Sequence, residues 1–292
     1  MTRPQTQYFE HDGHRLAYVE RGEGDRLVVL LHGLLLSKKM HRGLSRTLSE
    51  RGYRVISLDL LGHGQSDRPE DMTLHSMQLY AEQAIGLLDH LGVERAAFLG
   101  TSLGANTTLE IAALAPERVE AMVLEMPVLD NAIVGAGVAF LPFMVAMQIA
   151  GPLFEVGSWL ARRVPTSGLG VIDTIWDWPM DPPKPSLAVL RGLFFGRIAP
   201  PKAVRRTLTA PALVIGHQND PVHPFTDSDE LVRELPNGRL LEAESIIEMR
   251  VRPERISGEI AAFLDEAWKA GAKARRKPAR RKPAAGKRVA AA

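Results

Sequence analysis

Short apolar runs alternate with amphipathic helical patterns along most of this chain, and this alternation limits its possible folds more than any other feature. Continuous apolar runs occupy residues 25–33, 53–62, 95–102, 120–127 and 211–220. Apolar residues recur with helical spacing between and after these runs, over 41–51, 74–91, 103–115, 226–235 and 253–269. Strands that are joined by helices pair in parallel, through right-handed crossovers. The pattern predicts an α/β fold, a three-layer sandwich with helices on both faces of a mostly parallel sheet.

The N-terminal segment departs from this rhythm. Residues 7–22, QYFEHDG followed by HRLAYVERG, predict a β-hairpin that turns near Asp12 and Gly13. The start of the chain has no apolar segment of the kind found in signal peptides. Together with the absence of cysteine, this favours a cytoplasmic protein, either free or peripheral to a membrane.

The interval 127–210 also departs from the alternation of strands and helices, because this interval contains no clear strand. Its first part, residues 132–154, carries no charge and exceeds the roughly 20 residues needed to span a bilayer. Glycine and proline interrupt the run at Gly135, Gly137, Pro142 and Gly151. We therefore expect no transmembrane span, but short apolar helices that cover a pocket or touch a membrane surface. An insertion at this place predicts a helical cap over the site.

The C-terminal segment 272–292 holds nine of the 36 basic residues and no acid. The remaining 27 basic and 34 acidic residues give residues 1–271 a net charge of −7. Two copies of RRKPA among alanines cannot bury enough surface to fold, so we expect residues 272–292 to be a disordered basic tail after a domain of residues 1–271. Such a tail predicts contact with nucleic acid or an anionic membrane, with a solubilising role as the alternative.

One strand end carries a motif for nucleophilic catalysis. Residues 100–104, GTSLG, fit GxSxG where an apolar strand passes into a helix. A sharp turn there would lift the Ser102 hydroxyl clear of the sheet and leave the Leu103 N–H free to donate. The simpler alternative is a serine that only caps the helix. His32-Gly33 ends another strand, and the N–H of Leu34 would supply a second donor.

These motifs, together with LDLLGHGQSDRP (58–69) and PALVIGHQNDPVHP (211–224), resemble the α/β-hydrolase superfamily, in its esterase, lipase and epoxide-hydrolase-like branch. The resemblance covers about residues 8–268 and implies a mostly parallel eight-stranded sheet. It implies Ser102 as nucleophile, Leu34 and Leu103 as oxyanion-hole amides, and Asp220 as the acid. Asp220 could instead only organise its turn; Glu125 and Asp130 are second choices for the acid.

The general base is the open question. In the family the histidine follows the last strand, and counting back from Pro253-Glu254 reaches Ile246, with Ser245 beside it. Neither side chain takes a proton at neutral pH. The alternatives are His223, His217, or a desolvated carboxylate such as Glu244 or Glu248. His32 and His63 belong to motifs in which the ring is usually structural.

Three functions follow from these alternatives. The first is a serine hydrolase for a small hydrophobic ester or acyl substrate, with Ser102, Asp220 and His223 as its catalytic residues. The second is a catalytically impaired protein that binds an apolar ligand or partner under the cap. The third is tethering through the tail. No metal-binding or phosphate-binding pattern occurs, so we expect no cofactor.

Overall fold

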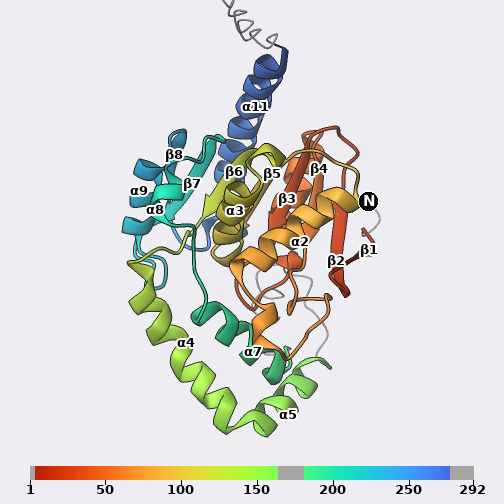
Figure 1. Ribbon diagram of the computed structural model, residues 1–292, viewed down its shortest axis with the longest axis vertical. Coiled ribbons are helices and arrows are strands. Elements are labelled where there is room, and N and C mark those ends of the chain that lie inside the picture. Colours follow the sequence, from red (N-terminus) through yellow and green to blue (C-terminus); the bar gives the residue numbers. More distant parts are fainter. Residues whose placement is uncertain (1–3, 164–180, 277–292) are drawn as a thin grey trace, which may run out of the picture.

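A computed structural model describes residues 4–163 and 181–276 (Figure 1). Its sheet has the strand order β1-β2-β4-β3-β5-β6-β7-β8, with β1 and β2 antiparallel and the rest parallel. The strands are β1 (Thr6–His11), β2 (His14–Arg21), β3 (Leu27–Leu31), β4 (Arg54–Leu58), β5 (Ala96–Thr101), β6 (Val119–Glu125), β7 (Ala212–His217) and β8 (Gly238–Ala243).

The predicted helices cover both faces of this sheet. Against one face pack α2 (Met77–His90), α3 (Leu103–Leu114) and α9 (Phe225–Glu234), and against the other α1 (Arg42–Glu50) and α11 (Glu254–Arg276). The mostly parallel eight-stranded sandwich predicted from the sequence is therefore confirmed. The hairpin between β1 and β2 turns at Asp12 and Gly13, both with positive φ, as a two-residue hairpin loop requires.

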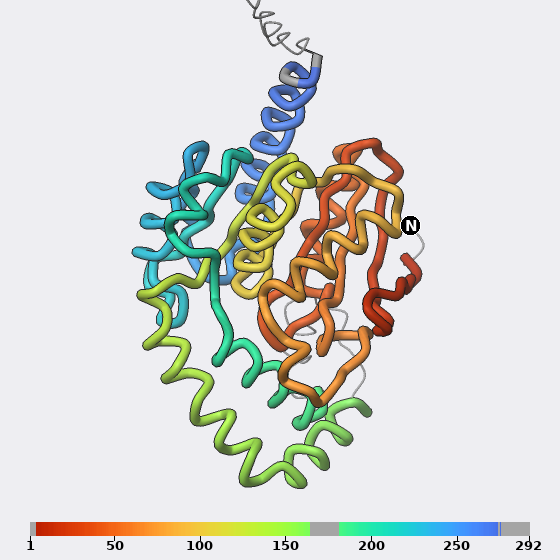
Figure 2. Tube along the Cα trace, viewed as in Figure 1, coloured from red at the N-terminus to blue at the C-terminus, as the bar shows by residue number. Residues whose placement is uncertain are grey.

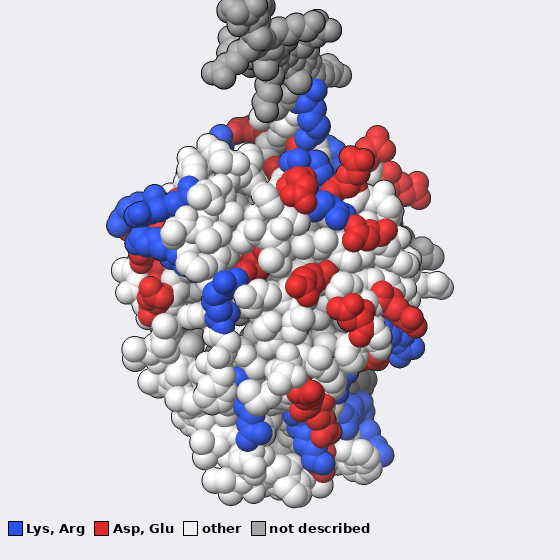
Figure 3. All heavy atoms as spheres, viewed as in Figure 1, with Lys and Arg blue, Asp and Glu red and all other residues white. Residues whose placement is uncertain are grey.

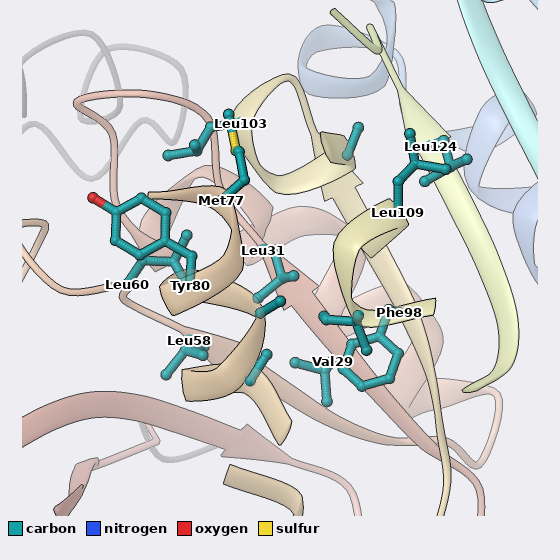
Figure 4. Packing of buried hydrophobic residues seen from close by; sticks show 14 of the residues in the cluster. Val29, Leu31, Leu58, Leu60, Met77, Tyr80, Phe98, Leu103, Leu109 and Leu124 are labelled. Carbon is teal, nitrogen blue, oxygen red and sulfur yellow. The ribbon is translucent and has the colours of Figure 1, made fainter. Parts of the chain in front are cut away.

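The core consists of two clusters separated by the sheet. In β3, Val29 and Leu31 face the α2–α3 side, whereas Val28 and Leu30 face α1 and α11. This alternation follows from the two-residue period of a strand, and both faces are apolar because both are covered. Figure 4 shows the first cluster, where side chains from β3, β4, β5 and β6 meet those of α2 and α3. Met77 and Leu103 lie at the end of this cluster where the strands terminate.

The chain leaves the sheet after β6 and returns to it at β7 (Figure 2). In between it forms α4 (Ala132–Ile149), α5 (Gly151–Ala161), α7 (Pro183–Phe194) and α8 (Lys202–Arg205). Pro142 lies within α4, which continues through it as one helix. Trp176 and Trp178, which belong to the predicted cap, lie outside the described residues.

Asp227 of α9 holds the beginning of α4. Its buried carboxylate accepts hydrogen bonds from the backbone N–H groups of Leu129, Asn131 and Ala132, at 2.7, 3.2 and 3.1 Å. A negative charge at a helix N-terminus also complements the helix dipole. Helix α4 is thus fastened to the sheet domain at the point where it begins.

The C-terminal helix α11 extends beyond the sheet, at the opposite end of the molecule from α4 and α5 (Figure 1). It continues past the boundary that the sequence predicted at residue 272 and ends at Arg276. Arg275 donates to Glu120 at 2.8 Å, which holds the end of this helix against β6. The rest of the predicted tail, 277–292, lies outside the described residues.

Candidate active site

Ser102 occupies the junction between β5 and α3 in a strained conformation. Its φ is 53° and its ψ −109°, which costs a residue with a side chain about 1–3 kcal/mol. Its N–H donates to the Glu125 carbonyl at 2.8 Å, so the backbone is held to β6. The hydroxyl makes no capping bond to α3, so Ser102 does not serve as a side-chain helix cap.

Two glycines of the motif make this turn sterically feasible. A Cβ on Gly100 would lie 2.0 Å from the carbonyl of Gly104, and a Cβ on Gly104 would lie 2.2 Å from the Leu31 carbonyl. No side chain fits at either position without backbone movement. Close packing of α3 on β5 and β3 therefore requires the small residues that the motif supplies.

His223 lies against the Ser102 hydroxyl. Its Nε2 is 2.9 Å from Ser102 Oγ, and its Nδ1 is 2.9 Å from Asp220 Oδ2. An ionised carboxylate only accepts, so Nδ1 carries the proton and Nε2 is left to accept from the serine hydroxyl. The structure thus brings Ser102, His223 and Asp220 together in the arrangement of a catalytic triad.

Asp220 has two roles in its loop. Its Oδ1 accepts from the backbone N–H groups of Val222 and His223 at 2.8 and 3.0 Å, while Oδ2 faces the imidazole. Burial alone would raise the pKa of Asp220, but its hydrogen bonds from the His223 ring and from these two N–H groups hold the pKa below its ordinary value. The turn-organising role and the acid role that the sequence offered as alternatives are compatible.

Leu103 follows Ser102 directly in the chain, Leu34 follows Gly33 after β3, and both leucines line the same cavity as Ser102. Leu103 is the first residue of α3, where N–H groups have no acceptor within the helix. Leu34 lies in a turn closed by the Leu36 N–H and the Gly33 carbonyl, at 3.1 Å. The next residue, Leu35, is buried with a φ of 55°, a conformation unusual for leucine.

Backbone strain gathers around this site. Of the five residues other than glycine with positive φ in the described part of the chain, four follow the strands β3, β5, β6 and β7: Leu35, Ser102, Met126 and Asn219. All four strands end at the same edge of the sheet because they are parallel. Such conformations persist where the surroundings fix them, and they cluster at functional sites.

A cavity of about 400 Å³ opens above Ser102. Apart from Thr101, Ser102 and His223, the described residues that line it are apolar or contribute backbone, and none of them is charged. The sheet domain contributes Leu34, Leu36, Met40, Met77, Leu103, Met126 and Val222, among others, and the cap contributes Ile133, Ala136, Phe140, Leu193, Phe194 and Ile198. A pocket of this kind accepts an uncharged, hydrophobic group.

The other histidine candidates are bonded elsewhere. His32 Nε2 accepts from the Leu60 N–H at 3.1 Å, and His63 Nδ1 contacts the Leu61 carbonyl. Burial holds the pKa of His63 well below its ordinary value, so the ring stays neutral. His217 ends β7 with Nδ1 2.9 Å from the Ser245 carbonyl. None of these three rings lines the cavity.

The carboxylate alternatives are also placed elsewhere. Glu248 accepts from Arg255 Nε at 2.7 Å, and this hydrogen bond lowers the pKa of Glu248 instead of raising it toward neutrality. Glu244 is exposed. Ile246, where the family histidine was expected, is 44% exposed and does not line the cavity. The loop after β7, and not the one after β8, supplies the imidazole.

Glu125 and Arg250 form a buried ion pair next to the turn between β5 and α3 that carries Ser102. The sequence alone did not predict this pair. Arg250 of α10 (Glu248–Val251) donates from both guanidinium NH₂ groups to the Glu125 carboxylate, with Nη2 2.7 Å from Oε2. Thr101 Oγ1 donates to Glu125 Oε2 at 2.5 Å. Burial opposes ionisation, but the charge of Arg250 and the bonds from His217 and Arg250 hold the pKa of Glu125 well below its ordinary value. Glu125 therefore has a structural role. Asp130, the other residue considered as an alternative acid, is exposed.

Within residues 4–163 and 181–276, no group of three or more His, Asp or Glu side chains is arranged to hold a metal ion.

Comparison with known proteins places the fold. The model of the family described as "alpha/beta hydrolase fold" matches residues 26–164. Epoxide hydrolase A of Mycobacterium tuberculosis is 34% identical over 142 residues, which cover 48% of this chain and 44% of that protein. The chain spans less than half the length of the curated relatives it matches.

Solved structures resemble nearly the whole chain. The enol-lactonase of Burkholderia xenovorans LB400 superposes with a TM-score of 0.73 over 89% of this chain and 100% of its own, at 21% identity. A thermophilic esterase from Thermogutta terrifontis gives 0.71 over 90% and 99%, also at 21% identity. At this identity the likeness shows the fold. With the sheet order and the matched family model, it confirms the resemblance found in the sequence: the chain is a protein of the α/β-hydrolase fold.

Proposed function

We propose that this protein is a serine hydrolase that acts on uncharged hydrophobic esters or related acyl compounds. The observation that carries the proposal is the 2.9 Å contact between Ser102 Oγ and His223 Nε2, with Asp220 behind the imidazole. A serine hydroxyl is a weak nucleophile unless a base takes its proton, and this contact provides the base.

The proposed reaction has two halves. His223 Nε2 takes the proton as Ser102 Oγ attacks the carbonyl carbon, and the N–H groups of Leu34 and Leu103 stabilise the resulting oxyanion. The imidazolium, stabilised by Asp220, then gives its proton to the leaving alcohol, and an acyl-serine remains. Water, deprotonated by the same nitrogen, attacks the acyl group, and His223 then returns the proton to Ser102 Oγ as the acid leaves.

The cavity supports the substrate class. None of the described residues that line it is charged, so a charged group on the acyl portion would lose its hydration without a partner among them. Methionines and phenylalanines, among them Met40, Met77, Phe140 and Phe194, would instead contact an aliphatic or aromatic acyl group.

The nucleophile argues against epoxide opening, the reaction named for one of the relatives. In that chemistry a carboxylate attacks the epoxide and gives an ester, which water can cleave. A serine would give an ether, which water does not cleave under these conditions. Ser102 therefore fits acyl transfer, the chemistry of esterases and lactonases.

A fluorophosphonate probe and a series of p-nitrophenyl esters test the proposal. We expect the probe to label the native chain but not Ser102→Ala. We expect Ser102→Ala and His223→Gln each to lower kcat by about 10⁶-fold, the loss seen when a serine-hydrolase triad loses its serine or histidine. Ser49→Ala and His14→Gln are matched controls, since both residues lie outside the cavity. A folded native chain that takes no label and cleaves none of the esters would refute the proposal.

A further inference from the structure

Helix α4 is apolar on two opposite faces. Ile133, Ala136 and Phe140 line the cavity, and Met144 and Met147 continue this inner row as buried residues. Val134, Val138, Leu141, Val145 and Ile149 lie on the other side, and each is at least half exposed. A surface helix of a water-soluble domain normally carries polar residues on its outer face. Burial of the inner row therefore does not explain why the outer face of α4 is also apolar.

Helix α5 extends the outer row. Leu153, Val156, Trp159 and Leu160 are exposed, at 51–72%. Of the 18 large hydrophobic side chains exposed in the described part of the chain, ten lie between Ile133 and Leu160. We call the exposed residues of α4 and α5 together the outer cap face. Figure 3 draws the lower left of the molecule, where α4 lies in Figure 1, almost without charge.

We propose that the outer cap face binds the surface of a lipid bilayer, with α4 and α5 lying in the interface. Large exposed apolar patches mark either protein or membrane contacts, and two observations favour the membrane. The first is composition: the α4 part of the face is aliphatic, whereas the residues that dominate protein–protein binding are Trp, Tyr and Arg. The second is shape, because α4 and α5 meet at the projecting end of the molecule (Figure 1), and a projecting edge fits a fluid phase without a complementary partner surface.

The border of the face fits the headgroup region. Trp159 lies toward the end of α5 with the Arg163 guanidinium 3.2 Å from its ring centroid, a pair with an apolar body and a cationic tip. Lys184 and Arg191 of α7 also lie on the cap, beside Glu155 and Gln148. Tryptophan and basic side chains concentrate where hydrocarbon meets the headgroups.

A spanning helix is a different arrangement, and the contacts of α4 oppose it. Among the described residues, α4 is the one helix long and apolar enough to cross a membrane. Its inner row, however, forms a wall of the cavity, and Asp227 holds its first turn against α9. Crossing would strip the helix from both. Lying in the interface keeps these contacts and buries only the outer row.

Vesicle flotation with the full chain tests the proposal. In about 0.5 M salt, where charges more than about 4–5 Å apart are screened, the basic C-terminal segment contributes little. We expect the native chain to float with phosphatidylcholine vesicles under these conditions. We expect Val138→Glu/Val145→Glu to lower its partition coefficient by at least about tenfold, because both charges would enter the apolar layer. Neither residue lines the cavity, and glutamate suits an exposed helix at least as well as valine.

Leu114→Glu is the matched control. Leu114 is 48% exposed at the end of α3, outside the cap, so its variant should float like the native chain. Ser102→Ala should also float normally, which separates docking from the proposed chemistry. Hydrolysis of a water-soluble ester by Val138→Glu/Val145→Glu should be unchanged, which shows that the variant is folded.

Five results would overturn the proposal. The native chain could fail to float, the double variant could float normally, or Leu114→Glu could lose as much binding as the double variant. Alternatively, light scattering could show a dimer that Val138→Glu/Val145→Glu dissociates, which would assign the face to a second copy. Alkaline carbonate should release the vesicle-bound chain; release by detergent alone would mean that α4 spans the bilayer.

Discussion

Asp220 and His223 are three residues apart in one loop, and their mutual contact depends on the turn that Asp220 itself organises. The two backbone N–H groups bonded to Oδ1 fix the carboxylate, and the opposite oxygen then meets the ring. The sequence NDPVHP restricts the loop further, since Pro221 and Pro224 have fixed φ values. Acid and base are thus positioned by local geometry.

Asp220→Asn should reduce kcat by about 10⁴-fold, the loss measured when the acid of a serine-protease triad becomes an amide. The reason is that an amide can donate to Nδ1, which favours the tautomer with its proton on Nε2. Esterase assays across the ester series measure the change. Asp229→Asn, at a partly exposed position of α9 outside the cavity, is the control. An unchanged rate in Asp220→Asn would leave Asp220 with a structural role only.

The same variant has a signature in stability. Because the pKa of Asp220 is depressed in the folded state, its carboxylate stabilises the fold above its unfolded pKa, and this contribution is lost as pH falls through the folded pKa. The deficit of Asp220→Asn in the free energy of unfolding should therefore be full at neutral pH and shrink in acid. Urea titrations at several pH values measure it.

At the level of elements, strands end where chemistry is needed, and this much followed from the sequence. Parallel strands place their carboxyl ends at one edge, so Ser102 after β5 and Leu34 after β3 could be named in advance, and the family resemblance added Asp220 after β7 as the acid. The base could be named only as one of several alternatives. Hydrophobic periodicity locates strands, but it does not determine the direction in which a loop side chain points.

A spacing signal for the base was nonetheless present. A histidine three residues after an aspartate in a turn can return to that carboxylate, which the structure shows for His223. The Glu125–Arg250 pair offered no such signal. Its members are 125 residues apart, and only the stacking of α10 on the ends of β5 and β6 brings them together.

Arg250→Met should lower the free energy of unfolding by about 3–5 kcal/mol, because it leaves Glu125 ionised and buried without a counter-charge. The Glu125→Leu/Arg250→Met double variant should recover part of this loss, since no unpaired charge remains. Arg239→Met, which removes an exposed partner of Glu266, should change the free energy by at most about 1 kcal/mol. Chemical denaturation at pH 7 measures all three.

The loss in free energy of unfolding caused by Arg250→Met should become smaller at acidic pH. The native Glu125 has a depressed pKa, so the stability it contributes is present above its unfolded pKa and declines as pH falls through the folded value. In the variant, burial without Arg250 favours the protonated form, which acid supplies. If the loss in free energy of unfolding stayed constant from pH 7 to pH 4, Glu125 would not be the ionised partner of Arg250.

For the molecule as a whole, the C-terminal helix and the apolar helices α4 and α5 lie at opposite ends of the long axis. α11 leaves the sheet at one end, and α4 and α5 form the other (Figure 1). The sequence predicted a helix over 253–269 and an apolar insertion over 127–210, but their placement at opposite ends depends on the topology and could not be read from composition.

Deletion of residues 277–292 removes six basic residues and should lower retention on heparin, because fewer counterions are released on binding. Salt elution from heparin and from immobilised duplex DNA measures this. A version in which those lysines and arginines become glutamine is the matched control for length, and it should elute early like the deletion. If both elute with the native chain, the segment is a solubilising tail. Flotation in high salt should be the same for all three chains.

Because Asp220 and His223 lie in one loop, the catalytic residues and the last elements of the fold occupy separate parts of the sequence. Every side chain that would handle a proton is encoded before residue 224, so β8 and α11 complete the architecture without taking part in the reaction. Fraying at that border of the sheet should first weaken the scaffold and leave the chemical apparatus assembled, whereas in a protein whose imidazole follows the last strand the same fraying would remove the base itself.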